Sequence, residues 1–595
     1  MMKQKNRSQL IYEHLPGYIV PPLIPIPEPG DIRSLANTGI RLTPGSECII
    51  RTFLRISGFM PFWKKSPEIL EDLLRQHSMR LPGLCSPVIS ATAALVDDPR
   101  SMSPVERAAT LVCAVRSLYD DLMSAKLPQD EYRGQPLEMG QYANLFSTSL
   151  VIENRKVRMH KSAKFTQITV IANHRMYIQE IGTPGHDVSI EQIQDALGRI
   201  IKKAYASPAE VPAIGTLTAA GNHTQFRAFD QLLRNRANAT AYGELRESFF
   251  TLCLDLDAMP ADDAEAAQLA HSQNHANRYH HSSLQLVVFG NGKACGIFNF
   301  TTYLDGNPMS RSAAEIQKRA AMQALESTKG AESIHSTAIN PLPEARELHW
   351  SINPKMEQLA QQESAEITDH QAATFEISGI GRQFFAANQV SAVPAFITAL
   401  QMTTDRLVGQ PVQITQFLTL SRYRCMDLEI TDVSTPDMID YTRLMNQENQ
   451  DPERAFAGLQ QAILSQTEAM RQIRQGINLE ALIMLYLKQQ KGVRLFLSTS
   501  MLVVCMTILM VMKALASHQK EILVSHPDIY PEVSVFGRPG VRLPYVKYYG
   551  LHYQIMNEKI VITMMPGLNW KIPNSDFICE LQGSLEKIRL IIHVD

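Results

Sequence analysis

The sequence predicts a mixed α/β (α+β) protein made of two large halves with similar architecture. The chain has 595 residues, more than one hydrophobic core usually organises. Along it the apolar spacing changes from helical to strand-like and back, and this succession occurs twice. A polar, proline-marked stretch at 329–354 separates the two rounds and is the best candidate for a domain boundary.

Helices are predicted at the start of the first half and again between its strands. Helices are expected over residues 66–125, because apolar residues recur at three- and four-residue spacing in segments 67–77 and 104–123. Amphipathic patterns predict two further helices, at 188–205 and 224–240.

Three segments of the first half have the pattern of strands, at 165–181, 248–257 and 282–303. Within the last segment, Gly290-Asn291-Gly292 has the composition of a hairpin turn, so this segment is expected to contain two paired strands. Helices interleaved with strands in this order indicate an α+β sandwich.

The second half repeats the order of helices followed by strands. Helices are expected from about 393 to 409 and from 435 to 525. Strands are expected at 549–555 and 560–566, followed by a closing amphipathic helix at 575–592.

These patterns predict an N-terminal extension with a helical cap at 1–94, a first domain at 95–345 and a second domain at 346–595. The second domain would carry an apolar helical insertion near 490–520. Its segment 495–512 has no charged residue, but it is at the short limit for a membrane span of roughly 20 residues and contains serine and threonine. This composition favours a helix buried in a large core over a membrane span.

The net charge limits the kinds of partner to expect, and the cysteines indicate the cellular compartment. A formal charge of -2 gives no field that would attract nucleic acid or an anionic membrane, so small molecules and other proteins are the expected partners. The 8 cysteines are scattered singly without a C-x-x-C pair, which predicts reduced thiols in a cytoplasmic protein. The first 30 residues are broken by prolines and lack the apolar run of a signal peptide.

Seven segments carry a further signal, and they are 15–28, 134–146, 248–255, 277–296, 341–354, 406–410 and 523–530. Taken together in this order, they resemble the choline/carnitine acyltransferase family. That family moves acyl groups between coenzyme A and the hydroxyl of carnitine or choline. The resemblance implies a tandem of two chloramphenicol-acetyltransferase-like domains, the fold of coenzyme A-dependent acyltransferases, with the active site in a tunnel between them.

The resemblance also locates a catalytic position, and this chain departs from the family there. The family pattern H-x-x-x-[DE]-G places Thr301 at the catalytic histidine and Asp305 at the carboxylate that orients it. A threonine hydroxyl is not basic near pH 7, and the loss of a general base typically costs a factor of roughly 10²–10⁴ in rate. Thr301 could act as a nucleophile activated by Asp305, or simply fill a strand position suited to a β-branched residue.

Two adjacent histidines offer a substitute base. His280 and His281 are expected on the strand that pairs with the strand leading to Thr301. Neighbouring strand residues point to opposite faces, so one of the two at most can face the site, and we prefer His281 because it occupies the family's acidic position. The alternative is a structural or solvated histidine. His271 and His275 have the i, i+4 spacing of zinc ligands, but their surroundings resemble a loop and we expect no metal site.

The donor side of the site is altered as well. Where the family holds coenzyme A phosphates with three lysines, this chain has Arg382, Ala386 and Gln389. Each lost charge-assisted contact removes about 1.5–3 kcal/mol, which predicts weak coenzyme A binding or none. The phosphopantetheine arm of an acyl carrier protein, which lacks the adenosine 3′-phosphate, would lose less. We expect no bound cofactor, only an acyl-thioester donor.

The acceptor side has changed from basic to acidic. The resemblance places Thr415, and then Asp427 and Glu429, where the family holds the carboxylate of carnitine with a tyrosine and an R-T-D motif. Acidic residues repel a carboxylate ligand, so carnitine is not the expected substrate.

Two main hypotheses follow. The chain is a divergent enzyme that transfers or condenses an acyl group from a thioester, without acting on carnitine, or it is an inactive pseudoenzyme that binds a partner. A third interpretation is a membrane-attached regulator that uses 495–512. Several altered positions hold specific polar groups, namely Asp427, Glu429 and the His280–His281 pair, rather than uniformly small apolar residues, which favours the enzyme.

Overall fold

A computed structural model provides the structure of the chain. It describes residues 13–26, 52, 54–55, 59–76, 90–95, 102–182, 188–206, 212–330, 341–368, 373–426, 428–447, 451–477, 482–483, 485–486, 521–526, 535–537, 548–566 and 571–592. The apolar segment 495–512 lies outside this set. Among the helices that belong to it, none combines the length and the apolar character needed to cross a bilayer.

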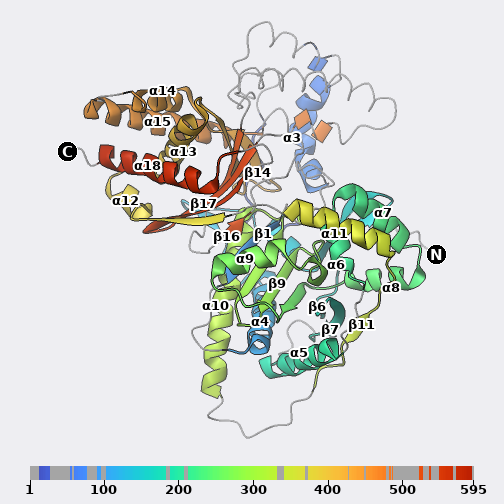
Figure 1. The fold of residues 1–595 in the computed structure, drawn as a ribbon. Coiled ribbons are helices and arrows are strands. Elements are labelled where there is room, and N and C mark those ends of the chain that lie inside the picture. The colour runs from blue at the N-terminus through green and yellow to red at the C-terminus, as the bar shows by residue number, and fades with distance from the viewer. Residues whose placement is uncertain are drawn as a thin grey trace. The chain divides into compact units, whose positions relative to one another are not determined.

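The chain forms two compact units, and each unit is assembled from segments that are far apart in the sequence (Figure 1). Unit 1 contains Met1–Val20, Leu81–His370 and Pro527–Val541. Unit 2 contains Pro21–Arg80, Gln371–His526 and Arg542–Asp595. No single cut in the chain therefore separates the two units.

Unit 1 is built on an eight-stranded mixed sheet. The strands β6, β8 and β9 run parallel to one another, and the remaining pairs are antiparallel. In spatial order the strands are β11 (Arg346–Leu348), β7 (Arg175–Glu180), β6 (Gln167–Ala172), β8 (Thr251–Asp255), β9 (Leu284–Phe289), β10 (Ala294–Asn299), β1 (Ser90–Leu95) and β16 (Val535–Gly537).

The hairpin turns predicted from sequence are confirmed. Strands β9 and β10 are joined through Gly290-Asn291-Gly292, where Gly292 has φ +83°, in the left-handed region that favours glycine. A side chain at Gly290 would place its Cβ 2.2 Å from the Leu256 carbonyl oxygen, so this position also requires glycine.

Strand β1 corrects the prediction that residues 66–125 are entirely helical. Residues 90–95, with the sequence SATAAL, form a fully buried strand between β10 and β16. Small alanines show neither the helical nor the alternating apolar period, because every position of this strand is buried. The helices predicted at 67–77 and 104–123 are confirmed as α3 (Phe59–Gln76) and α4 (Pro104–Met123).

Helices cover both faces of the first sheet. One face packs against α4, α5 (Ile190–Tyr205) and α10 (Gly306–Gly330), with α4 and α10 in direct contact (Figure 1). Local signals start two of these helices, since Ser103 caps α4 and Ser189 forms a capping box on α5. The other face packs against α6 (Ile214–Ala219), α7 (Asn222–Leu232), α8 (Arg236–Leu245), α9 (Asp263–Ser272) and α11 (Pro354–Thr368).

Short elements connect these layers and carry the candidate site. Two small antiparallel pairs accompany the main sheet. These elements are β2 (Glu131–Tyr132), β3 (Gln135–Pro136), β4 (Thr148–Glu153), β5 (Lys156–Lys161) and the 3₁₀ helices η2 (Gly140–Leu145), η3 (His275–Asn277) and η4 (Phe300–Thr302).

Unit 2 is built on a six-stranded sheet. In spatial order its strands are β12 (Ala373–Ser378), β18 (Lys559–Pro566), β17 (Tyr548–Ile555), β15 (Glu521–Ser525), β13 (Gln413–Thr419) and β14 (Leu428–Asp432). Its core lies between one face of this sheet and α12 (Arg382–Ala387), α13 (Ala392–Val408), α14 (Pro436–Met445), α15 (Pro452–Ile473) and α18 (Asn574–Ile592).

One expectation for unit 2 was wrong. Helices were predicted from 435 to 525, but Glu521–Ser525 forms β15 at the centre of the sheet, parallel to both neighbours. The predicted strands at 549–555 and 560–566 and the closing helix at 575–592 are confirmed.

Candidate active site

The candidate catalytic position lies just after β10. The strand ends at Asn299, and Thr301 belongs to the 3₁₀ helix η4 that leads toward α10. The expectation that Thr301 fills a strand position is therefore wrong. Thr301 is half-buried, and the chain turns sharply behind it, since Tyr303 has φ +59°.

The hydroxyl of Thr301 is engaged by its neighbour Asn299. Thr301 Oγ1 donates to Asn299 Oδ1 at 2.5 Å, and the Thr301 backbone N–H donates to the same oxygen at 3.0 Å. Asn299 Nδ2 in turn donates to the His280 carbonyl at 2.9 Å. Sequence reasoning missed Asn299, although an asparagine directly after a strand is a common signal for such a local turn.

Asp305 is buried and makes two hydrogen bonds with Gln141. Gln141 Nε2 donates to Asp305 Oδ2 at 2.8 Å, and the Asp305 backbone N–H donates to Gln141 Oε1 at 2.8 Å. Both side chains are 1% exposed. The partners are 164 residues apart, and Gln141 lies in the segment 134–146 that was recognised without being given a role.

A buried ion pair between Asp130 and Arg311 lies beside this clamp. Tyr142 donates from its hydroxyl to Asp130 Oδ2 at 2.5 Å, and Arg311 of α10 pairs with the same carboxylate. Asp130 and Arg311 are 3% and 4% exposed. The start of α10 is thereby tied to η2, which fixes the position of the Asp305 carboxylate.

His281 points into the protein, toward α7. It lies in a turn before β9 rather than in the strand, since the Ser282 N–H donates to the Tyr279 carbonyl. Its Nε2 is 2.9 Å from Gln225 Oε1, and because that oxygen only accepts, the imidazole donates from Nε2. Burial lowers the pKa of His281 to about 3, so the ring is neutral at pH 7. Its role as a substitute base stays a prediction.

The other histidines of this region bond to different partners. His280 Nε2 is 3.0 Å from His275 Nδ1, and burial, reinforced by His275 and Arg278, lowers the pKa of His280 well below its usual value. His271 lies in α9 rather than in a loop, and its Nδ1 is 2.8 Å from Thr92 Oγ1. Within the ranges that the structure describes, no group of three or more His, Cys, Asp or Glu could hold a metal ion.

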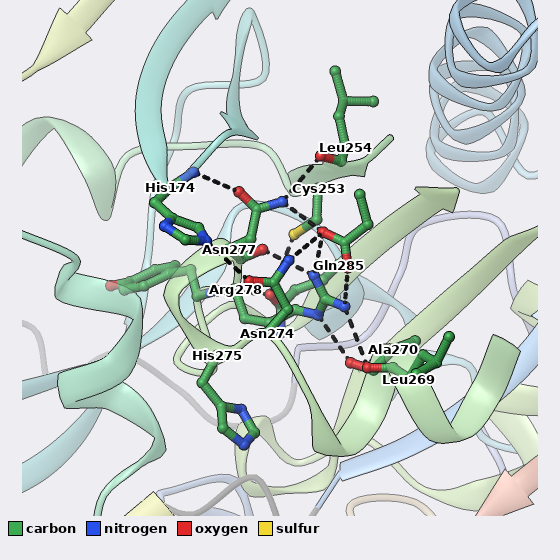
Figure 2. A network of polar contacts seen from close by, with 12 residues as sticks. His174, Cys253, Leu254, Leu269, Ala270, Asn274, His275, Asn277, Arg278 and Gln285 are labelled. Carbon is green, nitrogen blue, oxygen red and sulfur yellow. Dashed lines mark hydrogen bonds and ion pairs between the residues drawn. The ribbon is translucent and has the colours of Figure 1, made fainter. Parts of the chain in front are cut away.

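A buried arginine fixes the segment that carries these histidines (Figure 2). Arg278 is fully buried and forms a two-pronged ion pair with Asp255, with contacts of 3.0 Å to Oδ1 and 2.7 Å to Oδ2. It also donates to the Ala270 carbonyl at 2.9 Å, and Asn277 donates to Asp255 Oδ1 at 2.6 Å. In Figure 2 the His275 ring points away from this network. Sequence reasoning gave neither Arg278 nor Asp255 a role.

The predicted donor and acceptor residues belong to unit 2. Arg382 is exposed at the first position of α12, and its backbone N–H donates to the Met556 carbonyl at 2.7 Å. Thr415 is 2% exposed in β13, and its Oγ1 has no hydrogen-bond partner among the described residues. Asp427 lies outside the described residues, and of Glu429 the structure gives the backbone register, opposite Leu418.

Unit 2 contains a buried histidine, His552, and a half-buried one, His526, that sequence reasoning missed. The His526 ring lies 4.8 Å from the Tyr553 ring, and His552 sits on the sheet face opposite the core. Burial is the main cause that lowers the pKa of both His526 and His552 to about 3. Neither has the near-neutral pKa that suits a general base.

The fold and site together define an acyltransferase-like α/β protein with a buried, fixed carboxylate. The family model for choline/carnitine O-acyltransferases matches residues 76–576, and the chain belongs to this family. Its fold is accordingly of the chloramphenicol-acetyltransferase type.

Individual relatives are distant. Mouse carnitine O-acetyltransferase is 26% identical over 324 residues, which cover 51% of this chain and 49% of the relative. Human choline O-acetyltransferase is 23% identical over 397 residues, covering 63% and 51%. This chain therefore spans about half the length of these relatives. Among solved structures, the first condensation domain of the calcium-dependent antibiotic synthetase has a TM-score of 0.40 and 9% identity, covering 93% of this chain and 97% of that domain.

Proposed function

We propose that this chain transfers or condenses acyl groups taken from a thioester, and that carnitine is not its acceptor. The proposal is supported by the family membership of the chain and by one observation in particular. The carboxylate of Asp305 is buried and clamped by Gln141. The family correspondence places Thr301 at the imidazole that this carboxylate would orient. A fixed carboxylate beside that position supports a chemical role for the site.

Carnitine is excluded on two physical grounds. Its hydroxyl must lose a proton while it attacks the thioester, and a missing general base slows this step by roughly 10²–10⁴. Its carboxylate would meet Asp427 and Glu429 if the family correspondence holds, and like charges repel.

The acyl donor is a coenzyme A or carrier-protein thioester. Arg382 is the one cation at the three positions where the family places phosphate-binding lysines. Two lost contacts at about 1.5–3 kcal/mol each favour a donor with fewer phosphates, such as a phosphopantetheine arm.

The decisive experiment incubates the purified full chain with acyl-coenzyme A and, separately, with an acyl-carrier protein, in the presence of a mixed panel of acceptors. Thiol release above the protein-free rate, with carnitine inert as acceptor, supports the proposal. An Asp305→Asn variant should lose that release, whereas Asp263→Asn, at an exposed carboxylate of α9, should retain it. Release that persists in Asp305→Asn would contradict the role of the carboxylate.

A second candidate function is an inactive binding protein. It is favoured by the hydrogen bonds that hold Thr301, His280 and His281 to other side chains. Calorimetry separates the two candidates, since a binding protein would bind an acyl thioester without releasing thiol.

The substitute-base prediction for His281 has its own test. Replacement by glutamine keeps a group able to hydrogen-bond to Gln225 but cannot accept a proton. If His281 is the base, His281→Gln lowers kcat by roughly 10²–10⁴ with little change in KM. An unchanged kcat would remove it from the mechanism.

A further inference from the structure

In the described part of the chain, the acceptor of the Thr301 hydroxyl proton is an amide oxygen. Thr301 Oγ1 donates to Asn299 Oδ1, and that oxygen also accepts the Thr301 backbone N–H. An amide oxygen is not a base near pH 7, so this contact does not activate the hydroxyl. The nearby Asp305 carboxylate accepts a hydrogen bond from Gln141.

The neighbouring histidines are engaged by other side chains. His280 is bonded to His275, and His281 is bonded to Gln225 of α7. Both rings are at most 5% exposed, and burial lowers the pKa of each below its usual range. Neither His280 nor His281 therefore has the pKa near 7 that suits general base catalysis of alcohol attack.

This arrangement discriminates between classes of acceptor. An alcohol is about as weak an acid as water, whose pKa is about 15.7, so it attacks a thioester well only while a base removes its proton. An unprotonated amine already has a free lone pair and attacks before it loses a proton. An α-amino group, with a pKa of about 7.7–8.0, is substantially unprotonated near physiological pH.

We infer that the acceptor is a primary amine of moderate basicity, such as the α-amino group of an amino acid or its amide; this inference rests on the proposed function. The amine nitrogen forms a bond to the thioester carbonyl carbon, and the carbonyl electrons move to oxygen. When they return, the C–S bond breaks and the thiolate leaves. The extra proton on nitrogen passes to the thiolate through water, which gives an amide and a free thiol.

The fixed carboxylate suits this reaction as well. The tetrahedral intermediate formed from an amine carries positive charge on nitrogen until the proton leaves. Gln141 holds both the carboxylate and the backbone N–H of Asp305, so a negative group at this position needs little reorganisation to stabilise that cation.

A matched pair of acceptors tests the inference with the full-length chain. Glycinamide and glycolamide differ only in the attacking group, and octanoyl-coenzyme A and octanoyl-phosphopantetheine serve as donors. Thiol release and product mass are measured, and the protein-free rate is subtracted. We expect acylation of glycinamide to exceed that of glycolamide by at least about 100-fold. Ethanolamine, which carries both groups, should give the amide rather than the ester.

The Thr301→His variant provides the complementary arm. A restored imidazole should raise the glycolamide rate by roughly 10²–10⁴ and narrow the preference for the amine. The wild-type chain provides a second test that does not require the variant to fold. Its rate with glycinamide should rise about tenfold per pH unit below the pKa of the amine and level off above it.

The outcomes distinguish the amine inference from the proposed acyl transfer. Glycolamide acylated as fast as glycinamide would overturn the amine inference and leave the proposed transfer intact. Absence of thiol release with every acceptor and both donors would overturn the proposed function, and the amine inference with it.

Discussion

At the scale of single residues, the site depends on a few long-range side-chain pairs. The Gln141–Asp305 clamp and the Arg278–Asp255 ion pair each satisfy a buried charge that would otherwise be costly. The partners of the first pair are 164 residues apart in the chain, and those of the second are 23 residues apart with α9 between them. Their energies should therefore be measurable by substitution of one partner.

Replacement of Gln141 by leucine should destabilise unit 1. The change removes one hydrogen bond to the buried Asp305 carboxylate and one from the Asp305 backbone N–H, and hydrogen bonds to a charged group contribute about 1.5–3 kcal/mol. Urea unfolding followed by circular dichroism measures the loss. The control Gln362→Leu, at an exposed position of α11, should change the unfolding free energy by less than about 0.5 kcal/mol.

Replacement of Arg278 by methionine should cost more. Breaking a buried ion pair by removing one partner leaves an uncompensated charge, here on Asp255, and typically costs 3–5 kcal/mol. Arg234→Met, which breaks the exposed pair with Asp230, is the matched control and should have a small effect. Equal losses in the two variants would show that burial of the Arg278 pair contributes nothing.

At the scale of elements, α11 acts as a cap for the helix beside the candidate site. Glu363 of α11 accepts from the Gly221 N–H at 3.1 Å and from Thr224 Oγ1 at 2.6 Å, at the start of α7. Helix α7 in turn supplies Gln225, which holds His281. The position of His281 therefore depends on a helix whose N-terminus is satisfied from another element rather than by its own sequence.

Loss of this cap should loosen α7 locally. Glu363→Ala removes the acceptor for an orphan N–H and a favourable charge at the helix N-terminus, which together are worth about 1–2 kcal/mol. Hydrogen exchange should speed up over residues 222–232 more than over α5. The exposed neighbour Gln362→Ala should leave both helices unchanged, and uniform acceleration in both helices would contradict the capping role.

At the scale of the whole molecule, each unit contains histidines that are kept neutral by burial. His281 in unit 1 and His526 and His552 in unit 2 all have a pKa of about 3, against an ordinary value of 6.5. A lowered folded-state pKa means that the unfolded chain binds the proton first as the pH falls. Stability is therefore complete above pH 6.5 and declines between pH 6.5 and about 3.

The decline should be visible by pH 5. Each such histidine should lower the unfolding free energy by about 2 kcal/mol between pH 7 and pH 5, measured by urea titration. His281→Gln should reduce the fall in the unfolding free energy of unit 1 between pH 7 and pH 5. The control is His349→Gln, because the His349 side chain is 81% exposed, and it should leave this pH dependence unchanged. Equal pH dependence of stability in wild type and His281→Gln would contradict a neutral, buried His281.

The sequence by itself determined the features that are encoded locally. Alternation and turn residues such as Gly290-Asn291-Gly292 were sufficient for the β9–β10 hairpin, and apolar spacing was sufficient for most helices. The ordered segments also identified the family, because membership is a property of residue identity. The assignment of Thr301 to the position of the family's histidine stays a prediction.

Only the tertiary structure decided which residues meet. The alanine-rich β1 and the strand β15 carry no distinctive period, since both are central strands of a sheet and are specified by neighbours distant in sequence. The same holds for Gln141 against Asp305 and for the direction of His281, which points to α7. Such pairings depend on loop closure and packing between remote segments, and local patterns contain no information about them.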